Sequence, residues 1–118
     1  MAKERPQATP DTTTETPGDD ALRCIVCDHR ITDRAYRMEM SGAHEHTFVN
    51  PAGFVHVIGC FVAAAGCVHT GRVEEAFTWF PGWSWQVAIC GRCRAHVGWI
   101  FRCGGDQFHG LLFAALRM

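Results

Sequence analysis

Apolar and polar residues alternate in short segments along most of this chain. Tyr36, Met38 and Met40 alternate within residues 31–40, and residues 85–89 repeat the pattern. A period of two places every second side chain on the same face, as in a half-buried β-strand. The pattern therefore predicts an all-β domain. The further segments predicted as strands are 47–49, 54–58, 95–101 and 108–117.

Turn-forming residues separate these segments. Asn50-Pro51 followed by Gly53 is a strong turn signal, because proline fixes φ and the asparagine side chain can bond back to the chain. Pro81-Gly82 predicts a turn between two aromatic runs, and residues 103–107 predict a glycine-containing hairpin. The apolar segment 60–65 is too short for its periodicity to separate a strand from a helical turn.

The first 20 residues differ in composition from the rest of the chain. They are rich in threonine, proline and acidic residues, and such segments cannot bury enough apolar surface to offset the entropy lost on ordering. We expect residues 1–20 to be a disordered tail and residues 21–118 to form one domain. The tail lacks the apolar stretch of a secretory signal, and no run approaches the roughly 20 apolar residues of a membrane-spanning helix. We therefore expect a cytoplasmic protein without membrane contact.

Charge gives little support for a nucleic-acid partner. The chain has 11 Lys and Arg residues against 12 Asp and Glu residues, which gives a formal net charge of −1. Nucleic-acid-binding proteins usually gather basic residues on one face to neutralise phosphates, whereas the basic residues here are scattered. We expect no nucleic-acid partner, and the sequence identifies no protein partner.

Four of the seven cysteines form two C-x-x-C pairs, Cys24 with Cys27 and Cys90 with Cys93. In a reducing cytoplasm, pairs with this spacing indicate a metal site rather than disulfides. Each pair can wrap one side of a tetrahedral ion, and four thiolates favour one zinc ion with no open position, so the site is predicted to be structural. The remaining cysteines, expected to be small buried apolar side chains, are Cys60, Cys67 and Cys103.

The four tryptophans are concentrated near the second cysteine pair. All of them stand between residues 78 and 101: Trp79, Trp83, Trp85 and Trp99. The indole N–H of a buried tryptophan needs a partner, so these side chains form either an aromatic core or an open cage. A cage could hold a methylated ammonium group by cation–π attraction or a small flat ring. The carboxylates that would favour a cation, Glu74 and Glu75, stand upstream in a predicted loop.

Four motifs, in order, give the chain a resemblance to a known family. The sequence reads N-P-A-G-F-V-H at 50–56, W-F-P-G-W-S-W at 79–85, C-x-x-C at 90–93 and H-V-G-W-I-F at 96–101. Together with the first C-x-x-C pair, these segments resemble the CULT domain, the thalidomide-binding domain of cereblon, over about residues 22–117. Because the other regions of cereblon have no counterpart here, we expect a bacterial-type, single-domain member.

The resemblance implies a β-tent, in which two antiparallel sheets are pinned by a zinc site of four cysteines. It also implies a non-catalytic domain that holds cyclic imides in an aromatic cage, such as glutarimide, thalidomide-type ligands, uridine-like rings or the C-terminal cyclic imide of a protein. Three tryptophans would form the walls and a phenylalanine the base. The ligand-binding residues that the resemblance implies are Asn50, Pro51, Phe77, Thr78, Trp79, Trp85, Trp99 and Phe101.

The sequence departs from the family at the mouth of the implied cage. Ala76, Phe77 and Thr78 stand where cereblon has Glu-His-Ser, so a backbone contact to a ligand can persist while a histidine side-chain contact is lost. Ala52 likewise replaces a histidine. Recruitment of protein substrates depends on this surface and is not predicted for this chain.

Residues 90–98 also resemble the zinc and C-terminal region of methionine sulfoxide reductase B, which shares the β-tent. Those reductases place a catalytic cysteine in the last strand, roughly where this chain has Gly110, and the nearest thiol is Cys103 in the preceding hairpin. A nucleophile must be a thiolate within reach of its acid and its substrate. We therefore expect no enzymatic activity. A reductase and a methylammonium cage are the alternatives to imide binding.

Overall fold

The computed structural model describes residues 20–117, and the described chain is all-β, as predicted. The predicted tail, residues 1–20, lies outside the described residues except for Asp20. Neither described helix is long or apolar enough to cross a membrane. The elements are β1 (Ala21–Cys24), β2 (Arg30–Asp33), η1 (Arg34–Tyr36), β3 (Glu45–Val49), β4 (Val55–Phe61), β5 (Cys67–Glu74), β6 (Ser84–Cys90), β7 (His96–Cys103), β8 (Asp106–Leu112), η2 (Phe113–Ala115) and β9 (Leu116–Arg117).

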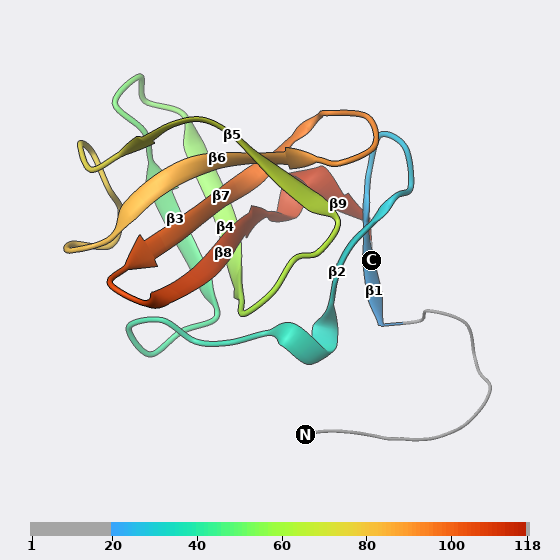
Figure 1. Ribbon diagram of the computed structural model, residues 1–118, viewed down its shortest axis with the longest axis horizontal. Coiled ribbons are helices and arrows are strands. Elements are labelled where there is room, and N and C mark those ends of the chain that lie inside the picture. The colour runs from blue at the N-terminus through green and yellow to red at the C-terminus, as the bar shows by residue number, and fades with distance from the viewer. Residues whose placement is uncertain (1–19, 118) are drawn as a thin grey trace.

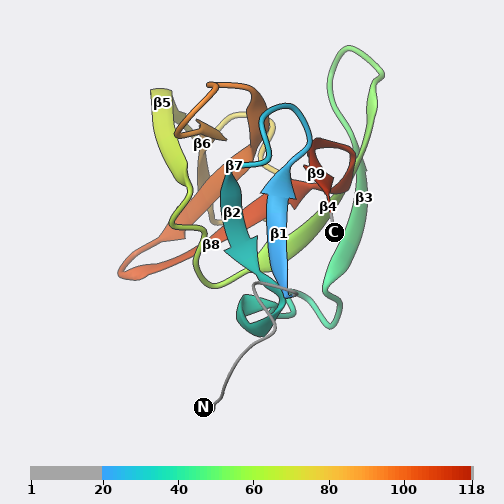
Figure 2. The same ribbon diagram turned by 90° about the vertical axis from the view of Figure 1, so that its right-hand side faces the viewer.

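The strands form two antiparallel sheets, which confirms the predicted fold class. The larger sheet has the order β3-β4-β8-β7-β6-β5, and the smaller one has the order β2-β1-β9. The larger sheet spreads across Figure 1, and the smaller sheet stands at its side, where the view of Figure 2 places β1 and β2 in front. Each sheet thus presents one face to the other.

Two buried clusters lie on opposite faces of the larger sheet. One lies between the sheets and includes Leu22 of β1 and Val97 of β7. The other includes Phe101 of β7 and Phe108 of β8, with tryptophans packed against it. Strand β7 contributes to both clusters because its register with β6 shifts next to Gly98, whose φ is 155°. A Cβ at Gly98 would lie 2.2 Å from the carbonyl oxygen of residue 110, so only glycine fits there.

The prediction of one strand over residues 31–40 is wrong. Strand β2 ends at Asp33, whose side-chain Oδ1 accepts a hydrogen bond from the Ala35 N–H at 3.0 Å. This N-cap starts the 3-10 helix η1 and turns the chain away from the smaller sheet. The alternating methionines Met38 and Met40 instead pack against the tryptophan-containing cluster, so their period of two reflects burial without a regular strand.

The predicted closing strand over residues 108–117 is divided between the two sheets. Strand β8 pairs with β4 and β7 as far as Leu112, and the helix η2 then carries the chain across to the smaller sheet. Strand β9 pairs there with β1, and its Leu116 joins the cluster between the sheets. The C-terminal segment therefore links both sheets.

Candidate functional site

The two C-x-x-C pairs come together at one end of the molecule. The Sγ atoms of Cys24, Cys27, Cys90 and Cys93 all lie within 4.8 Å of one another. The first pair follows β1 of the smaller sheet and the second follows β6 of the larger sheet. The cluster therefore joins the two sheets.

The two cysteine turns have the same backbone geometry. The carbonyl of Cys24 accepts a hydrogen bond from the N–H of Asp28 at 2.8 Å, and the carbonyl of Cys90 accepts one from Arg94 at 2.9 Å. Asp28 and Arg94 both have a φ of 69°. Left-handed backbone is unusual for an arginine, and here it closes a tight turn that aims two thiols at one point.

The spacing of the thiols fits a tetrahedral ion. The Cys24–Cys93 and Cys27–Cys90 sulfur pairs are each 3.6 Å apart, and zinc–sulfur bonds of about 2.3 Å would place tetrahedral ligands about 3.8 Å apart. Burial alone would raise the pKa of Cys90, but hydrogen bonds from the N–H groups of Cys93 and Arg92 outweigh it and lower the pKa to about 7. The spacing of the four sulfur atoms would allow the cluster to hold a metal ion, which binds cysteine as the thiolate.

The other three cysteines lie outside this cluster. Cys60 is fully buried, as predicted, and burial raises its pKa to about 11. Cys67 is half-buried, and burial raises its pKa to about 12. Cys103 is exposed, so its predicted burial is wrong, because it ends β7 at the tip of the β7–β8 hairpin.

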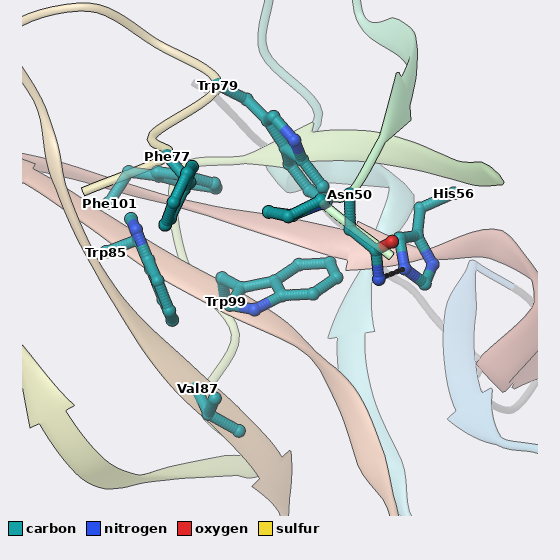
Figure 3. Close-up of a pocket in the computed structure, with 9 residues that line it drawn as sticks. Asn50, His56, Phe77, Trp79, Trp85, Val87, Trp99 and Phe101 are labelled. Carbon is teal, nitrogen blue, oxygen red and sulfur yellow. Dashed lines mark hydrogen bonds between the residues drawn. The ribbon is translucent and has the colours of Figure 1, made fainter. Parts of the chain in front are cut away.

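An aromatic cavity of about 340 Å³ opens on the other face of the larger sheet (Figure 3). Seven of the eight predicted ligand-binding residues line it. Carboxylate and thiol groups are absent from its described lining. The lining residues are Asn50, Pro51, His56, Phe77, Trp79, Trp85, Val87, Trp99 and Phe101.

The cavity and the predicted set differ at three positions. Thr78 does not line the cavity, because its hydroxyl bonds to the backbone N–H and C=O of Phe80 at 3.3 and 3.2 Å. Val87 was not among the predicted residues, although its alternation with Trp85 places it on the same face of the strand. His56, which reaches the cavity from β4, was not predicted either, although it ends the N-P-A-G-F-V-H motif.

Strand pairing sets two tryptophan walls and the base of the cavity. Trp85 of β6 stands opposite Phe101 of β7, and Val87 stands opposite Trp99. Residues two apart on a strand share a face, and directly paired residues share it too, so all four side chains point to the same side. Trp79 arrives from the loop before β6 and meets Trp99 edge to face, with ring centroids 4.8 Å apart.

The base of the cavity is held rigidly by packing beneath it. Phe101 is 1% exposed and stacks on Phe108, with centroids 5.1 Å apart. Gly110 lies directly below, where a Cβ would be 2.9 Å from the Phe101 ring and 2.8 Å from Ile58. No larger side chain fits at Gly110 without displacing the base.

Asn50 and His56 form a polar edge of the cavity (Figure 3). The Asn50 Oδ1 accepts hydrogen bonds from the N–H groups of Ala52 and Phe54 at 3.0 and 2.9 Å. The Asn50 amide nitrogen is thereby turned toward His56 Nε2, 3.4 Å away. Because the oxygen is engaged in the loop, the amide nitrogen is the donor that Asn50 contributes to this polar edge, beside His56.

Two histidines flank Trp99. The ring centroid of His96 lies 4.8 Å from that of Trp99, and the centroid of His56 lies 5.5 Å from it. The His96 Nε2 donates a hydrogen bond to the carbonyl of Gly98 at 2.9 Å. Burial lowers the pKa of His96, which favours the neutral ring and keeps this edge of the cage uncharged at neutral pH.

The loop that carries Trp79 is anchored to the sheet. The indole Nε1 of Trp85 donates a hydrogen bond to the carbonyl of Ala76 at 2.8 Å. Phe48 supports Trp79 from outside the cavity, stacked on it at 4.8 Å with ring planes 7° apart. Between the two anchors lies Phe77, which has a φ of 60° and is 76% exposed.

Comparison with known proteins relates the chain to cereblon. No protein-family model matches it. Protein cereblon of Danio rerio is 39% identical over 104 residues, which cover 81% of this chain and 24% of the relative. Protein cereblon of Drosophila virilis is 30% identical over 106 residues, covering 80% and 16%, and that of Drosophila pseudoobscura pseudoobscura is 26% identical over 106 residues, covering 80% and 17%.

The similarity covers most of this chain but only a small part of each relative. The chain spans about a quarter or less of the length of the curated relatives it matches. The matches, the all-β fold and the cysteine cluster are together consistent with a cereblon-like CULT domain.

Proposed function

We propose that this cereblon-like domain is a non-catalytic binding module that holds a small cyclic imide in its aromatic cavity. The observation that carries the proposal is the box made by Trp79, Trp85 and Trp99 over the base Phe101. A flat, partly saturated ring places its methylene groups against such walls. Its polar imide edge then faces the backbone of the loop that holds Phe77 and Trp79.

The size of the cavity suits a small ligand. Ligand pockets usually enclose about 300–1,000 Å³, so a cavity of about 340 Å³ lies near the lower end of that range. Glutarimide has about 8 heavy atoms, and a limit of about −1.5 kcal/mol per atom bounds its binding free energy near −12 kcal/mol. We expect about −5 to −8 kcal/mol, which corresponds to weak to micromolar binding.

The lining of the cavity favours a neutral ligand over a methylated ammonium group. The described lining supplies aromatic faces but no carboxylate to balance a buried cation. At its polar edge the Asn50 oxygen is engaged by the loop, so Asn50 offers an amide donor, which suits a carbonyl oxygen better than a cation. A methylammonium cage is the second candidate, favoured only by the aromatic walls.

Catalysis by a thiol has no support around the cavity. The position where a reductase would place its nucleophile is Gly110, and a side chain there would strike Phe101 and Ile58. Cys103 is exposed at the tip of a hairpin and does not line the cavity. The domain is therefore proposed to bind its ligand without changing it.

The cysteine cluster is proposed to hold one structural zinc ion. Cys24, Cys27, Cys90 and Cys93 would supply all four ligands, and this leaves no position for a reactive water. Zinc would stabilise the cysteine turns and the junction of the two sheets. Cysteines kept as thiolates fit the reducing cytoplasm proposed for the chain.

Titration with glutarimide, followed by tryptophan fluorescence, tests the proposal. The zinc-loaded protein should show a saturable change that Trp99→Ala abolishes, since tryptophan anchors in desolvated pockets usually cost at least about 2 kcal/mol when truncated. Trp83→Phe is the matched control, because Trp83 lies outside the cavity and packs on Phe108. A flat response from the folded protein, or a response to trimethyl-lysine instead, would reject the imide cage.

A further inference from the structure

A fifth cysteine stands beside the cysteine cluster. Cys67 begins β5, where it is paired directly with Cys90, the last residue of β6. Side chains of directly paired residues point to the same face of a sheet, and here both thiols pack into the buried cluster between the two sheets. Cys67 is not one of the four cysteines whose sulfur atoms gather within 4.8 Å of one another. It is therefore a free thiol next to a proposed metal ligand.

The backbone hydrogen bonds show that Cys67 and Cys90 are a closely spaced pair. One residue beyond them on each strand, the N–H of Gly91 donates to the carbonyl of Gly66 at 2.8 Å. The N–H of Cys67 bonds to the carbonyl of Ala64 at 3.1 Å, so it is not engaged with Cys90. In antiparallel sheets such a non-hydrogen-bonded pair has Cα atoms about 4.5 Å apart. A disulfide needs Cα atoms about 4.4–6.8 Å apart, so this pair can be joined with little movement of the backbone.

Gly66 holds Cys67 beside the second cysteine turn. The N–H of Gly66 donates to the carbonyl of Ile31 in β2 at 3.0 Å. A Cβ at Gly66 would lie 1.9 Å from the carbonyl oxygen of Arg30, so only glycine lets the chain pass this close to β2. Cys67 therefore stays beside Cys90 as long as the two sheets remain joined.

We propose that Cys67 is an oxidation site, at which a hydroperoxide joins it to Cys90 in a cross-strand disulfide and so releases the metal ion. This inference rests on the structural metal proposed above. In the first step the Cys90 thiolate attacks hydrogen peroxide: an S–O bond forms, the O–O bond breaks, and Cys90 becomes a sulfenic acid while hydroxide leaves. The sulfur of Cys67 then attacks that of Cys90. The S–S bond forms, the S–O bond breaks, and the oxygen leaves as water with the proton of the Cys67 thiol.

The position of Cys67 outside the metal set suits it to this role. A metal ion would engage all four sulfur atoms of the cysteine cluster, so a disulfide within the cluster requires two ligands to leave the ion. A disulfide with Cys67 requires the loss of Cys90 alone. Because β5 and β6 both belong to the larger sheet, the new bond does not replace the link from the cluster to β1 in the smaller sheet. Oxidation should therefore weaken the junction of the two sheets.

Treatment of the zinc-loaded protein with hydrogen peroxide tests the inference. Trypsin cuts after arginine, so it places Cys67 in peptide 38–72, together with Cys60, and Cys90 in peptide 73–92. Mass spectrometry without reduction should find these two peptides linked. Elemental analysis after desalting should find the zinc lost from the same sample, and a thiol reductant with added zinc should reverse both changes.

Two variants identify the thiol that reacts. Cys67→Ser keeps the size of the side chain but cannot form the disulfide. It should hold one zinc per chain before treatment, show no linked peptides after it, and lose zinc about fivefold more slowly than the wild type. Cys103→Ser is the matched control, because it removes an exposed thiol outside the cluster, and it should behave as the wild type does.

The outcomes separate the role of Cys67 from that of the metal. Disulfides confined to the four cluster cysteines, linked peptides that persist in Cys67→Ser, or equal zinc loss from this variant and the wild type would overturn the inference and leave the structural metal intact. An untreated wild type without zinc would instead remove the proposed metal, and this inference with it.

Discussion

Single side chains hold the cage by hydrogen bonds as well as by packing. Trp85 is both a wall of the cavity and a donor, because its Nε1–H bonds to the Ala76 carbonyl at 2.8 Å. This bond is a direct side-chain tie between the sheet and the loop that carries Phe77 and Trp79. Ring shape and indole donor at Trp85 are therefore separate contributions to binding.

The variant Trp85→Phe separates those two contributions. It keeps an aromatic wall but removes the donor, and a net hydrogen bond is worth about 0.5–1.5 kcal/mol. We expect imide affinity to fall about three- to tenfold, with faster amide hydrogen exchange in residues 75–79. Trp83→Phe, which alters no wall of the cavity, should change neither measurement. Unchanged exchange in Trp85→Phe would show that the loop is held by packing alone.

The cage residues divide into those that local sequence predicts and those that need the fold. Trp85, Trp99 and Phe101 share a face through strand alternation and pairing, which the sequence pattern anticipates. His56 reaches the cavity only because β4 and its turn approach the loop of Trp79, and no local pattern contains that contact. The resemblance to a known family supplied Phe77, whereas the clustering of the tryptophans had already marked Trp79 as part of a core or a cage.

At the scale of elements, a histidine pair joins the edge strand β5 to β8. The Nε2 atoms of His69 and His109 lie 2.9 Å apart. The residues next to His69 across the sheet, Ala88 of β6 and Gly98 of β7, are small and leave room for the two rings. Among the described residues, the buried Nδ1 of His109 has no hydrogen-bond partner. We infer that His109 donates its Nε2–H to His69, because an unpaired buried lone pair costs less than an unpaired N–H.

This pair predicts that acid weakens the fold. Burial lowers the pKa of His109 to about 4, and the charges of His69 and Arg102 add to the effect. The unfolded chain has a histidine pKa near about 6.5, so it binds more protons than the folded state between about pH 6.5 and 4. Stability should therefore be complete above about pH 6.5 and decrease as pH falls, by up to about 3 kcal/mol.

Urea unfolding of the wild type and His109→Gln between pH 7 and 4.5 measures the effect. Glutamine can still donate a hydrogen bond to His69 but does not titrate, so the variant should lose much of the acid-dependent decrease. Release of metal by acid would affect both proteins alike. Parallel pH dependence in the two proteins would contradict the role of His109.

Element boundaries were predicted less well than element types. The alternation of residues 31–40 has the period of a strand, but the Asp33 side chain caps a 3-10 turn and breaks it, and an apolar pattern does not record that capping bond. The segment 108–117 is mostly apolar, so its pattern could not show that the chain passes from one sheet to the other at η2. A local capping bond decided the first case, and pairing with strands of both sheets decided the second.

At the scale of the whole molecule, the cysteine cluster and the aromatic cavity share strands β6 and β7. Cys90 ends β6, and Cys93 lies in the turn to β7. The same two strands carry Trp85 and Trp99 into the cavity. The cage residues should therefore keep their positions only when the cysteine turn is formed, although the cluster and the cavity use different residues.

Removal of the metal should unfold the domain and abolish imide binding. Structural zinc is worth about 10–16 kcal/mol in small peptides, whereas whole domains are stable by about 5–15 kcal/mol. Cys93→Ser or a strong chelator should therefore remove the cooperative thermal transition, and zinc added to the chelated wild type should restore it. Cys103→Ser is the matched control, because that thiol is exposed and outside the cluster, and it should retain one zinc per chain by elemental analysis. A Cys93→Ser protein with full metal content and an unchanged Tm would contradict the structural role of the cluster, and imide binding by a stably folded metal-free protein would separate the cage from it.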